Sequence, residues 1–159
     1  MRREEIAWLE RALQDVPEGT VAVEFRNGTA PDGELGIQPL PAGPKGRGKM
    51  ELYEVYHGVH GSFCQFQGCG ASFCHRVNAR ALNLFYCRAG RVGWNTAAGT
   101  AVYLGAGELS LHGMDGCAAS EWSFPAGYAA GIALWVDLAR LEEACPEILR
   151  CAGFRTAAL

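Results

Sequence analysis

The chain has 159 residues, of which 49% are hydrophobic and 21 are glycine, and its formal net charge is −3 with a pI near 5.8. This composition excludes a disordered chain, and the length is that of one domain with an ordinary core. The negative charge provides no electrostatic basis for binding a polyanion, so we expect that the chain by itself does not bind DNA.

An amphipathic helix is predicted at the N-terminus, over residues 2–16. Its helical spacing is carried by Ile6, Leu9, Leu13 and Val16. Pro17 ends the helix, and alternating apolar residues then predict a strand over 20–26. Residues 27–49 are rich in Gly and Pro, which predicts a loop or tether with solvated basic residues. Residues 1–49 therefore form an N-terminal extension in this interpretation.

Short strands separated by glycine turns are predicted from Met50 to Val136. The expected strands are 51–57, 59–67, 71–76, 81–87, 91–96, 100–104, 107–112, 120–124 and 127–136. In the middle of this region the turns are expected at residues 88–90, 98–99 and 105–107. Repeated short strands with tight turns are typical of a sandwich or jelly-roll barrel, so residues 50–136 are expected to form a mainly β barrel.

The last segment, residues 137–159, is predicted to be helical. Asp137 is a candidate cap for a helix over 138–145, and Pro146 fits the first turn of a second helix that ends before Gly153. The apolar stripe of these helices consists of Leu138, Leu141, Ile148 and Leu149. Such a stripe either contacts a second copy of the chain or packs on the barrel.

The ordered set of residues around these turns resembles the N-terminal effector-sensing domain of AraC-type transcriptional regulators. The resemblance is carried by Tyr86, Cys87, Gly90, Arg91, Tyr103, Leu104, Gly105, Gly107, Glu108 and Leu109, and then by Ser120, Phe124, Pro125, Gly131, Val136, Asp137 and Leu138. It covers residues 50–155. It implies a cupin-like jelly-roll barrel, also called a double-stranded β-helix, with an N-terminal helix and one or two C-terminal helices.

The same resemblance implies a function in small-molecule sensing and dimerisation. A bound effector of unknown identity would favour one arrangement of the domain and change how an attached DNA-binding domain binds DNA. In that family helix-turn-helix units follow the sensor, and nothing in this chain matches them, so DNA would be contacted only through a C-terminal domain that this chain lacks. A homodimer is the expected assembly. A small cupin enzyme, such as a metal-dependent isomerase or dioxygenase, is the alternative, and an orphan binding module is a third interpretation.

The spacing of the histidines departs from that of metal-dependent cupin enzymes, which commonly use a His-x-His pair, a Glu and a later His. His57 and His60 are three residues apart and would point to opposite faces of a strand, and His112 has no such partner. Cys64, Cys69 and Cys74 have a spacing that does not favour a zinc site. No serine lies in a Gly-x-Ser-x-Gly motif. We therefore expect no catalytic residue, no metal and no cofactor.

Aromatic and polar residues on the predicted strands are candidates for an effector site. An eight-stranded barrel is wide enough for its own side chains or for one small ligand. Most aromatic residues in a barrel fill its core, whereas rings and polar groups that share the inner face can hold a ligand. The candidate effector-binding residues are His75, Asn83, Phe85, Trp94, Tyr103 and Trp122.

The expected location is the cytoplasm. No apolar run reaches the ~18 residues that cross a bilayer, and the first residues lack the continuous apolar core of a signal peptide. The seven cysteines are an odd number, which without an export signal favours reduced thiols. No contact with a membrane is expected.

Overall fold

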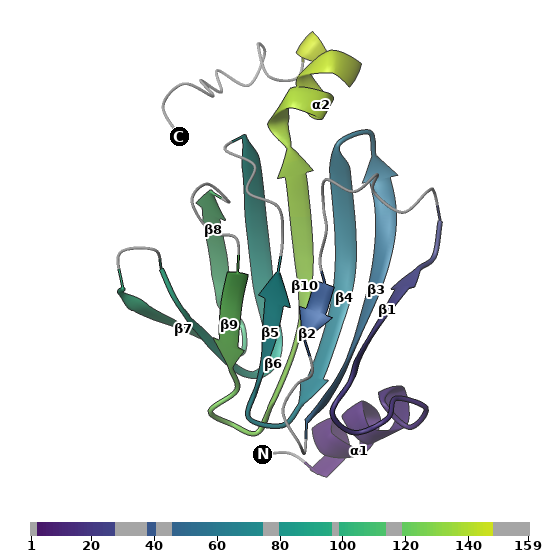
Figure 1. Ribbon diagram of the computed structural model, residues 1–159, viewed down its shortest axis with the longest axis vertical. Coiled ribbons are helices and arrows are strands. Elements are labelled where there is room, and N and C mark those ends of the chain that lie inside the picture. Colours follow the sequence, from purple (N-terminus) through teal and green to yellow (C-terminus); the bar gives the residue numbers. More distant parts are fainter. Residues whose placement is uncertain are drawn as a thin grey trace.

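The computed structural model describes residues 3–27, 38–40, 46–74, 80–96, 99–113 and 119–147. These residues are mainly in strands, with one helix before them and one after them (Figure 1). The elements are α1 (Arg3–Ala12), β1 (Val21–Phe25), β2 (Gln38–Leu40), β3 (Arg47–Tyr56), β4 (Val59–Gln67), β5 (Gly70–Cys74), β6 (Ala81–Asn95), β7 (Ala101–Gly105), β8 (Leu109–Gly113), β9 (Ala119–Ser123), β10 (Tyr128–Asp137) and α2 (Leu138–Ala144). Neither helix is long and apolar enough to span a bilayer.

The strands curl into a half-barrel with two facing parts. What we call the first sheet has the order β1-β3-β4-β10-β6-β8, and the second sheet contains β7, β9, β5 and β2. The long strand β6 belongs to both, because its first half pairs with β10 and β8 and its second half with β7 and β9. Strands β1 and β3 run parallel, and the other described pairs are antiparallel. The predicted class, a mainly β fold of curled sheets with flanking helices, is confirmed.

Strand β6 runs without a break through residues 88–90, where the sequence analysis predicted a turn. The pairing with β10 shifts there, because Gly131 lies opposite Cys87 while Ala130 lies opposite Ala89. Gly90 has a φ of 76°, in the left-handed region that favours glycine. A bulge followed by such a glycine bends a strand without ending it. The prediction of two separate strands in this region is therefore wrong.

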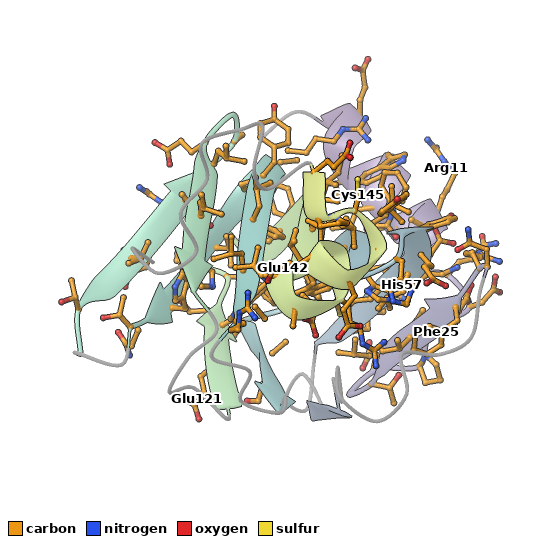
Figure 2. The ribbon with its side chains drawn as sticks, turned by 90° about the horizontal axis from the view of Figure 1, so that it is seen from above. Arg11, Phe25, His57, Glu121, Glu142 and Cys145 are labelled. Carbon is orange, nitrogen blue, oxygen red and sulfur yellow. The ribbon has the colours of Figure 1, made fainter. Side chains whose placement is uncertain are left out.

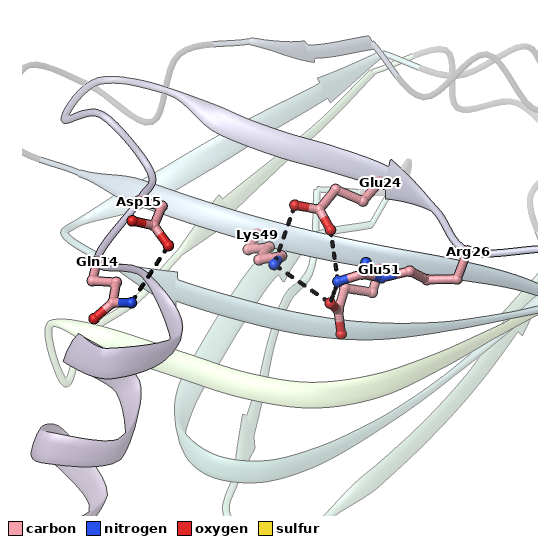
Figure 3. A network of polar contacts seen from close by, with 6 residues as sticks. All are labelled: Gln14, Asp15, Glu24, Arg26, Lys49 and Glu51. Carbon is pink, nitrogen blue, oxygen red and sulfur yellow. Dashed lines mark hydrogen bonds and ion pairs between the residues drawn. The ribbon is translucent and has the colours of Figure 1, made fainter.

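Part of the expected N-terminal extension belongs to the first sheet. Strand β1 pairs with β3, and β3 begins at Arg47, ahead of the boundary expected at residue 50. Lys49 lies on this strand, with its Nζ 3.2 Å from Glu24 Oε1 and 3.4 Å from Glu51 Oε1 (Figure 3). The interpretation of residues 27–49 as a tether is therefore wrong at its end. The strand there alternates the half-buried charged residues Arg47 and Lys49 with buried Gly48 and Met50.

Two groups of buried apolar residues hold the fold together. The larger fills the space between the two sheets and includes Phe66, Phe85, Val92, Phe124 and Trp135. The smaller lies under α1, where Leu9, Leu13 and Val16 pack against Tyr128. We call the side of the first sheet that faces the second sheet its inner face, and the side that carries α1 its outer face.

The C-terminal helix α2 begins as predicted. The side chain of Asp137 accepts hydrogen bonds from the backbone N–H groups of Ala139 at 3.0 Å and Arg140 at 3.1 Å, which is the geometry of an N-cap. Leu138 is 4% exposed, so the first residue of the expected stripe packs within its own chain. Ile148 and Leu149 lie outside the described residues.

Candidate functional site

Three of the residues proposed for effector binding meet on the inner face of the half-barrel. The ring centroid of Trp122 lies 5.2 Å from that of Phe85 and 6.4 Å from that of Trp94. Trp94 comes from the second half of β6 and Phe85 from its first half, so the bend in β6 places the two residues on facing sheets. The three rings form a continuous aromatic surface.

Asn83 lies beside this aromatic surface and is 4% exposed. It shares a face of β6 with Phe85, two residues later in the strand. Its partner across the sheet is His112 of β8, whose ring lies 5.7 Å from that of Trp94. His112 therefore connects Asn83 to the tryptophans, and it belongs to the same site although it was not among the candidates.

Tyr103 is placed apart from these residues. Its side chain is 53% exposed, and its ring covers Gly93, where an added Cβ would lie 2.5 Å from the ring. Because Gly93 precedes Trp94 in the strand, this side chain lies on the opposite face of the second sheet. The guanidinium of Arg91 lies 5.9 Å from the centroid of the tyrosine ring. The remaining candidate, His75, lies outside the described residues.

A row of side chains crosses the inner face of the first sheet at the end where β10 finishes. Directly paired residues of neighbouring strands share a face. Reading across β3, β4, β10, β6 and β8, the row consists of Glu54, His60, Trp135, Asn83 and His112. The next row includes Ser62, Phe85 and Ser110. Polar and aromatic side chains thus share one inner surface.

Several buried polar atoms of these rows have no hydrogen-bond partner among the described residues. They are His60 Nδ1, Asn83 Oδ1 and Ser110 Oγ. A buried polar group is normally paired with protein, water or ligand, and leaving one without a partner costs about 1–3 kcal/mol. The rows therefore offer donors and acceptors that a bound molecule can satisfy.

His60 presents a neutral imidazole to this surface. Burial lowers the pKa of His60 below its usual value, against the smaller opposing effect of the Glu54 carboxylate. A neutral imidazole carries one donor and one acceptor nitrogen. It is therefore suited to hydrogen bonding with an uncharged ligand.

The described residues do not fit a resident catalytic metal. His60 and His112 are separated by three strand spacings, or ~14 Å along the sheet, whereas two nitrogen ligands of one zinc ion lie within about 4 Å of each other. Within the described ranges no three His, Cys, Asp or Glu side chains are close enough together to bind one ion. The expectation that no metal is bound stays a prediction, since His75 is not described.

The buried cysteines behave as small apolar side chains. Cys64 and Cys87 lie between the sheets at 1% and 0% exposure, and burial raises the pKa of Cys64 to about 12. A thiol with so high a pKa stays protonated, so it is a poor nucleophile and a poor metal ligand. Cys69 is exposed. Cys64 is therefore a small buried apolar side chain, whereas Cys69 is not.

The sequence analysis missed His60, Ser62 and Ser110 as members of the site. Their spacing contained a usable signal, because His60, Ser62 and Cys64 alternate along β4 and so share one face. The intervening Phe63 obscured that signal, since a phenylalanine suggests the buried face, whereas its side chain is 46% exposed. Local sequence did not show which of the two faces is internal.

No family model matches the chain, and no curated protein matches its sequence. Among solved structures the chain is similar to a cupin 2 conserved barrel domain protein from Salinispora arenicola, with 19% identity, 79% of this chain and 98% of that chain covered, and a TM-score of 0.44. It is similar to the EutQ protein of Clostridium difficile, with 10% identity, 70% and 82% coverage and a TM-score of 0.45.

A third similar structure is an HTH_3 family transcriptional regulator from Vibrio cholerae, with 9% identity and a TM-score of 0.46. The match covers 56% of this chain and 50% of that one, so the chain spans half the length of the regulator. Identities and scores of this size assign no function to the chain.

Proposed function

We propose that the chain is a cupin-type sensor domain that binds a small molecule on the inner face of its half-barrel, as the resemblance to AraC-type regulators implies. The observation that carries this proposal is the set of buried atoms without described partners: His60 Nδ1, Asn83 Oδ1 and Ser110 Oγ. They lie on the same face as the rings of Phe85 and Trp135. Such groups lower the stability of the free protein, and a protein retains them when a bound ligand supplies their hydrogen-bond partners.

The chemistry of the site favours an uncharged ligand with a flat apolar surface and several hydrogen-bonding groups. The three atoms belong to an imidazole, an amide and a hydroxyl, which bear no full charge when His60 is neutral. A buried anionic ligand would need a positive charge beside it, whereas the charged side chain in the row, Glu54, is negative. The rings of Trp94 and Trp122 suit a planar or sugar-like ring, because such a ring stacks on aromatic faces.

Helix α2 contacts the ends of the strands that carry this site, so its position can change when a ligand binds. Trp135 in the polar row precedes the helix cap, Asp137, by two residues on β10. An added Cβ on Gly58 would lie 2.8 Å from the backbone nitrogen of Leu141, so the β3–β4 turn packs directly on the helix. Arg80, just before β6, forms an ion pair of 2.7 Å with Glu142. Figure 2 shows Glu142 on α2, over the end of the sheets at which the row lies.

This arrangement supports a population-shift mechanism. A ligand that bridges the polar row contacts β4, β10 and β6, and these are the strands whose ends hold α2. Binding would favour one position of the helix and so alter an attached DNA-binding domain. A metal-dependent enzyme, the alternative, requires a convergent donor set that the described residues do not supply.

Replacing Asn83 with leucine tests the assignment of the site. Neutral polar metabolites are screened against the 159-residue protein by thermal denaturation, and Kd is measured for those that stabilise it. We expect Asn83→Leu to weaken binding of such a compound about 10- to 100-fold, because a buried hydrogen bond is lost while the side-chain volume is kept. Tyr103→Phe is the control, since Tyr103 lies on the other face, and it should leave Kd unchanged. Equal affinity of the Asn83→Leu variant and the wild type would contradict the assignment.

A further inference from the structure

The outer face of the first sheet carries a contiguous set of apolar side chains that are exposed or half-buried. One row across β4, β10, β6 and β8 consists of Phe63, Ile132, Tyr86 and Leu109. The next row places Leu134, Leu84 and Leu111 side by side on β10, β6 and β8. We call these seven residues the outer apolar face. Exposed apolar residues that stand alone are ordinary, but two adjoining rows of them indicate an interaction surface.

Helix α1 covers only the neighbouring part of this side of the sheet. Tyr128 and Ala130 share the outer side of β10 with Ile132 and are 9% and 2% exposed, and Leu9 and Leu13 of α1 pack at this end. Ile132, the next residue of the series, is 36% exposed, and Leu109 and Leu111 are 56% and 60% exposed. Helix α1 therefore covers the residues of β10 up to Ala130 and leaves the outer apolar face uncovered.

The charged groups beside the face neutralise one another. Glu51 lies in the same row as Phe63, one strand further toward β1. Figure 3 shows Glu51 in a network with Arg26, Glu24 and Lys49, in which Arg26 also contacts Glu24 at 2.8 Å. The network pairs two positive with two negative side chains. The β3 side of the border therefore has no net charge. Such a border does not select a polyanion or an acidic peptide, and it is compatible with an identical surface.

The size of the outer apolar face matches what a dimer contact needs. Phe63, Tyr86, Leu109, Leu111 and Ile132 are 36–60% exposed. With 150–250 Å² for a whole side chain of this size, they present on the order of 500 Å² of apolar surface. A standard interface buries about 800 Å² per partner, of which about 60% is apolar, or about 480 Å². One copy of the chain therefore offers enough apolar area for one such contact.

We propose that the outer apolar face is the contact surface of a symmetric homodimer, in which two copies pack these sheets against each other. A two-fold contact places the same patch on both sides, so that apolar side chains meet apolar side chains and no opposite charges are needed. Two sheets stacked in this way lie about 10 Å apart and interdigitate their side chains. This surface is distinct from the C-terminal stripe, whose Leu138 is buried in its own chain. The proposal does not depend on effector binding.

A paired set of variants of the 159-residue protein tests the proposal by light scattering and sedimentation equilibrium. Leu109→Glu/Leu111→Glu introduces charges on β8, an edge strand of the first sheet, where exposed charges are tolerated by the fold. Phe25→Glu is the control. Phe25 is 46% exposed, as is Phe63, but it pairs with the inner-face residue Leu52 at the far edge of the sheet (Figure 2).

We expect the wild type and Phe25→Glu to have the mass of a dimer and the double variant that of a monomer, with dimer affinity at least about 100-fold weaker because four charges would be buried in one contact. The wild type is measured in 100-fold dilution steps from about 1 mM. A wild type that is monomeric throughout this series would overturn the proposal, as would a double variant that remains dimeric. In case the double variant does not fold, the methyl NMR signals of Leu109, Leu111 and Ile132 are followed on dilution of the wild type. Signals that do not move while the mass halves would place the contact elsewhere.

Discussion

Replacing Gly90 with alanine is expected to destabilise the protein by at least about 3 kcal/mol, because two penalties combine at this position. Gly90 has a φ of 76°, which an alanine adopts only at a cost of about 1–2 kcal/mol. In addition, a Cβ on Gly90 would collide with the backbone carbonyl oxygen of Tyr128 on β10. Because a backbone atom cannot rotate away as a side chain can, β6 and β10 would have to separate at the bulge.

Gly127→Ala provides the matched control for this prediction. Gly127 has a φ of 78°, but nothing lies within 4 Å of a Cβ built on it. It should therefore show the cost of the backbone conformation alone, about 1–2 kcal/mol. Both free energies of unfolding are measured by urea titration, at one protein concentration. Equal losses in the two variants would contradict the claim that close contact with Tyr128 fixes the bend in β6.

Replacing Phe66 with alanine is expected to cost about 3–5 kcal/mol of unfolding free energy, the usual range for a fully buried phenylalanine. Phe66 is 0% exposed, and its ring stacks on that of Phe124 at a centroid distance of 5.1 Å. It also meets the edge of Trp122 at 6.1 Å, so the cavity would open beside the proposed site. The loss is measured by chemical denaturation monitored by circular dichroism.

Phe25→Ala is the control for the Phe66 variant, because it removes the same atoms from a side chain that is 46% exposed. A surface truncation of this kind should cost no more than about 0.5 kcal/mol. If the two variants lost similar stability, the space between the sheets would not be the main core of the protein. The ratio of the two losses in unfolding free energy thus shows how much more apolar burial stabilises the space between the sheets than the edge of the first sheet.

Features that depend on neighbouring residues were predictable from the sequence. The cap of α2 by Asp137 and the turn at residues 105–107 appear where the sequence predicted them, and the N-terminal helix begins as predicted but ends at Ala12 instead of residue 16. At that turn the carboxylate of Glu108 accepts a hydrogen bond from the backbone N–H of Gly105, which closes the loop locally. These features need no information about distant parts of the chain.

Features that depend on long-range pairing were not predictable. A glycine at residue 90 is equally consistent with a turn and with a bend, and only the pairing of β6 with β10 on one side of it and β7 on the other distinguishes the two. The parallel pairing of β1 with β3 likewise joins the strand predicted over 20–26 to a strand whose first residues, 47–49, were predicted as the end of a tether.

The candidate site was only partly predictable, because strands with apolar residues on both sides do not reveal which side is internal. The structure brings the rings of Phe85, Trp94 and Trp122 together, whereas the side chain of Tyr103, an equally plausible aromatic residue, lies on the opposite face of its sheet. The same ambiguity concealed the outer apolar face, since Leu109 and Leu111 alternate as a core strand would and are nevertheless exposed.

The most direct test of the proposed ligand site is the indole N–H NMR spectrum of the wild-type protein, recorded while a stabilising neutral metabolite is added. The chain has four tryptophans, of which Trp94, Trp122 and Trp135 line the inner face and Trp8 lies on α1, beside Arg88. We expect the three inner-face signals to shift in a saturable manner while that of Trp8 stays in place. Saturable shifts of Trp8, with the signals of Trp94, Trp122 and Trp135 unchanged, would contradict a ligand site between the sheets.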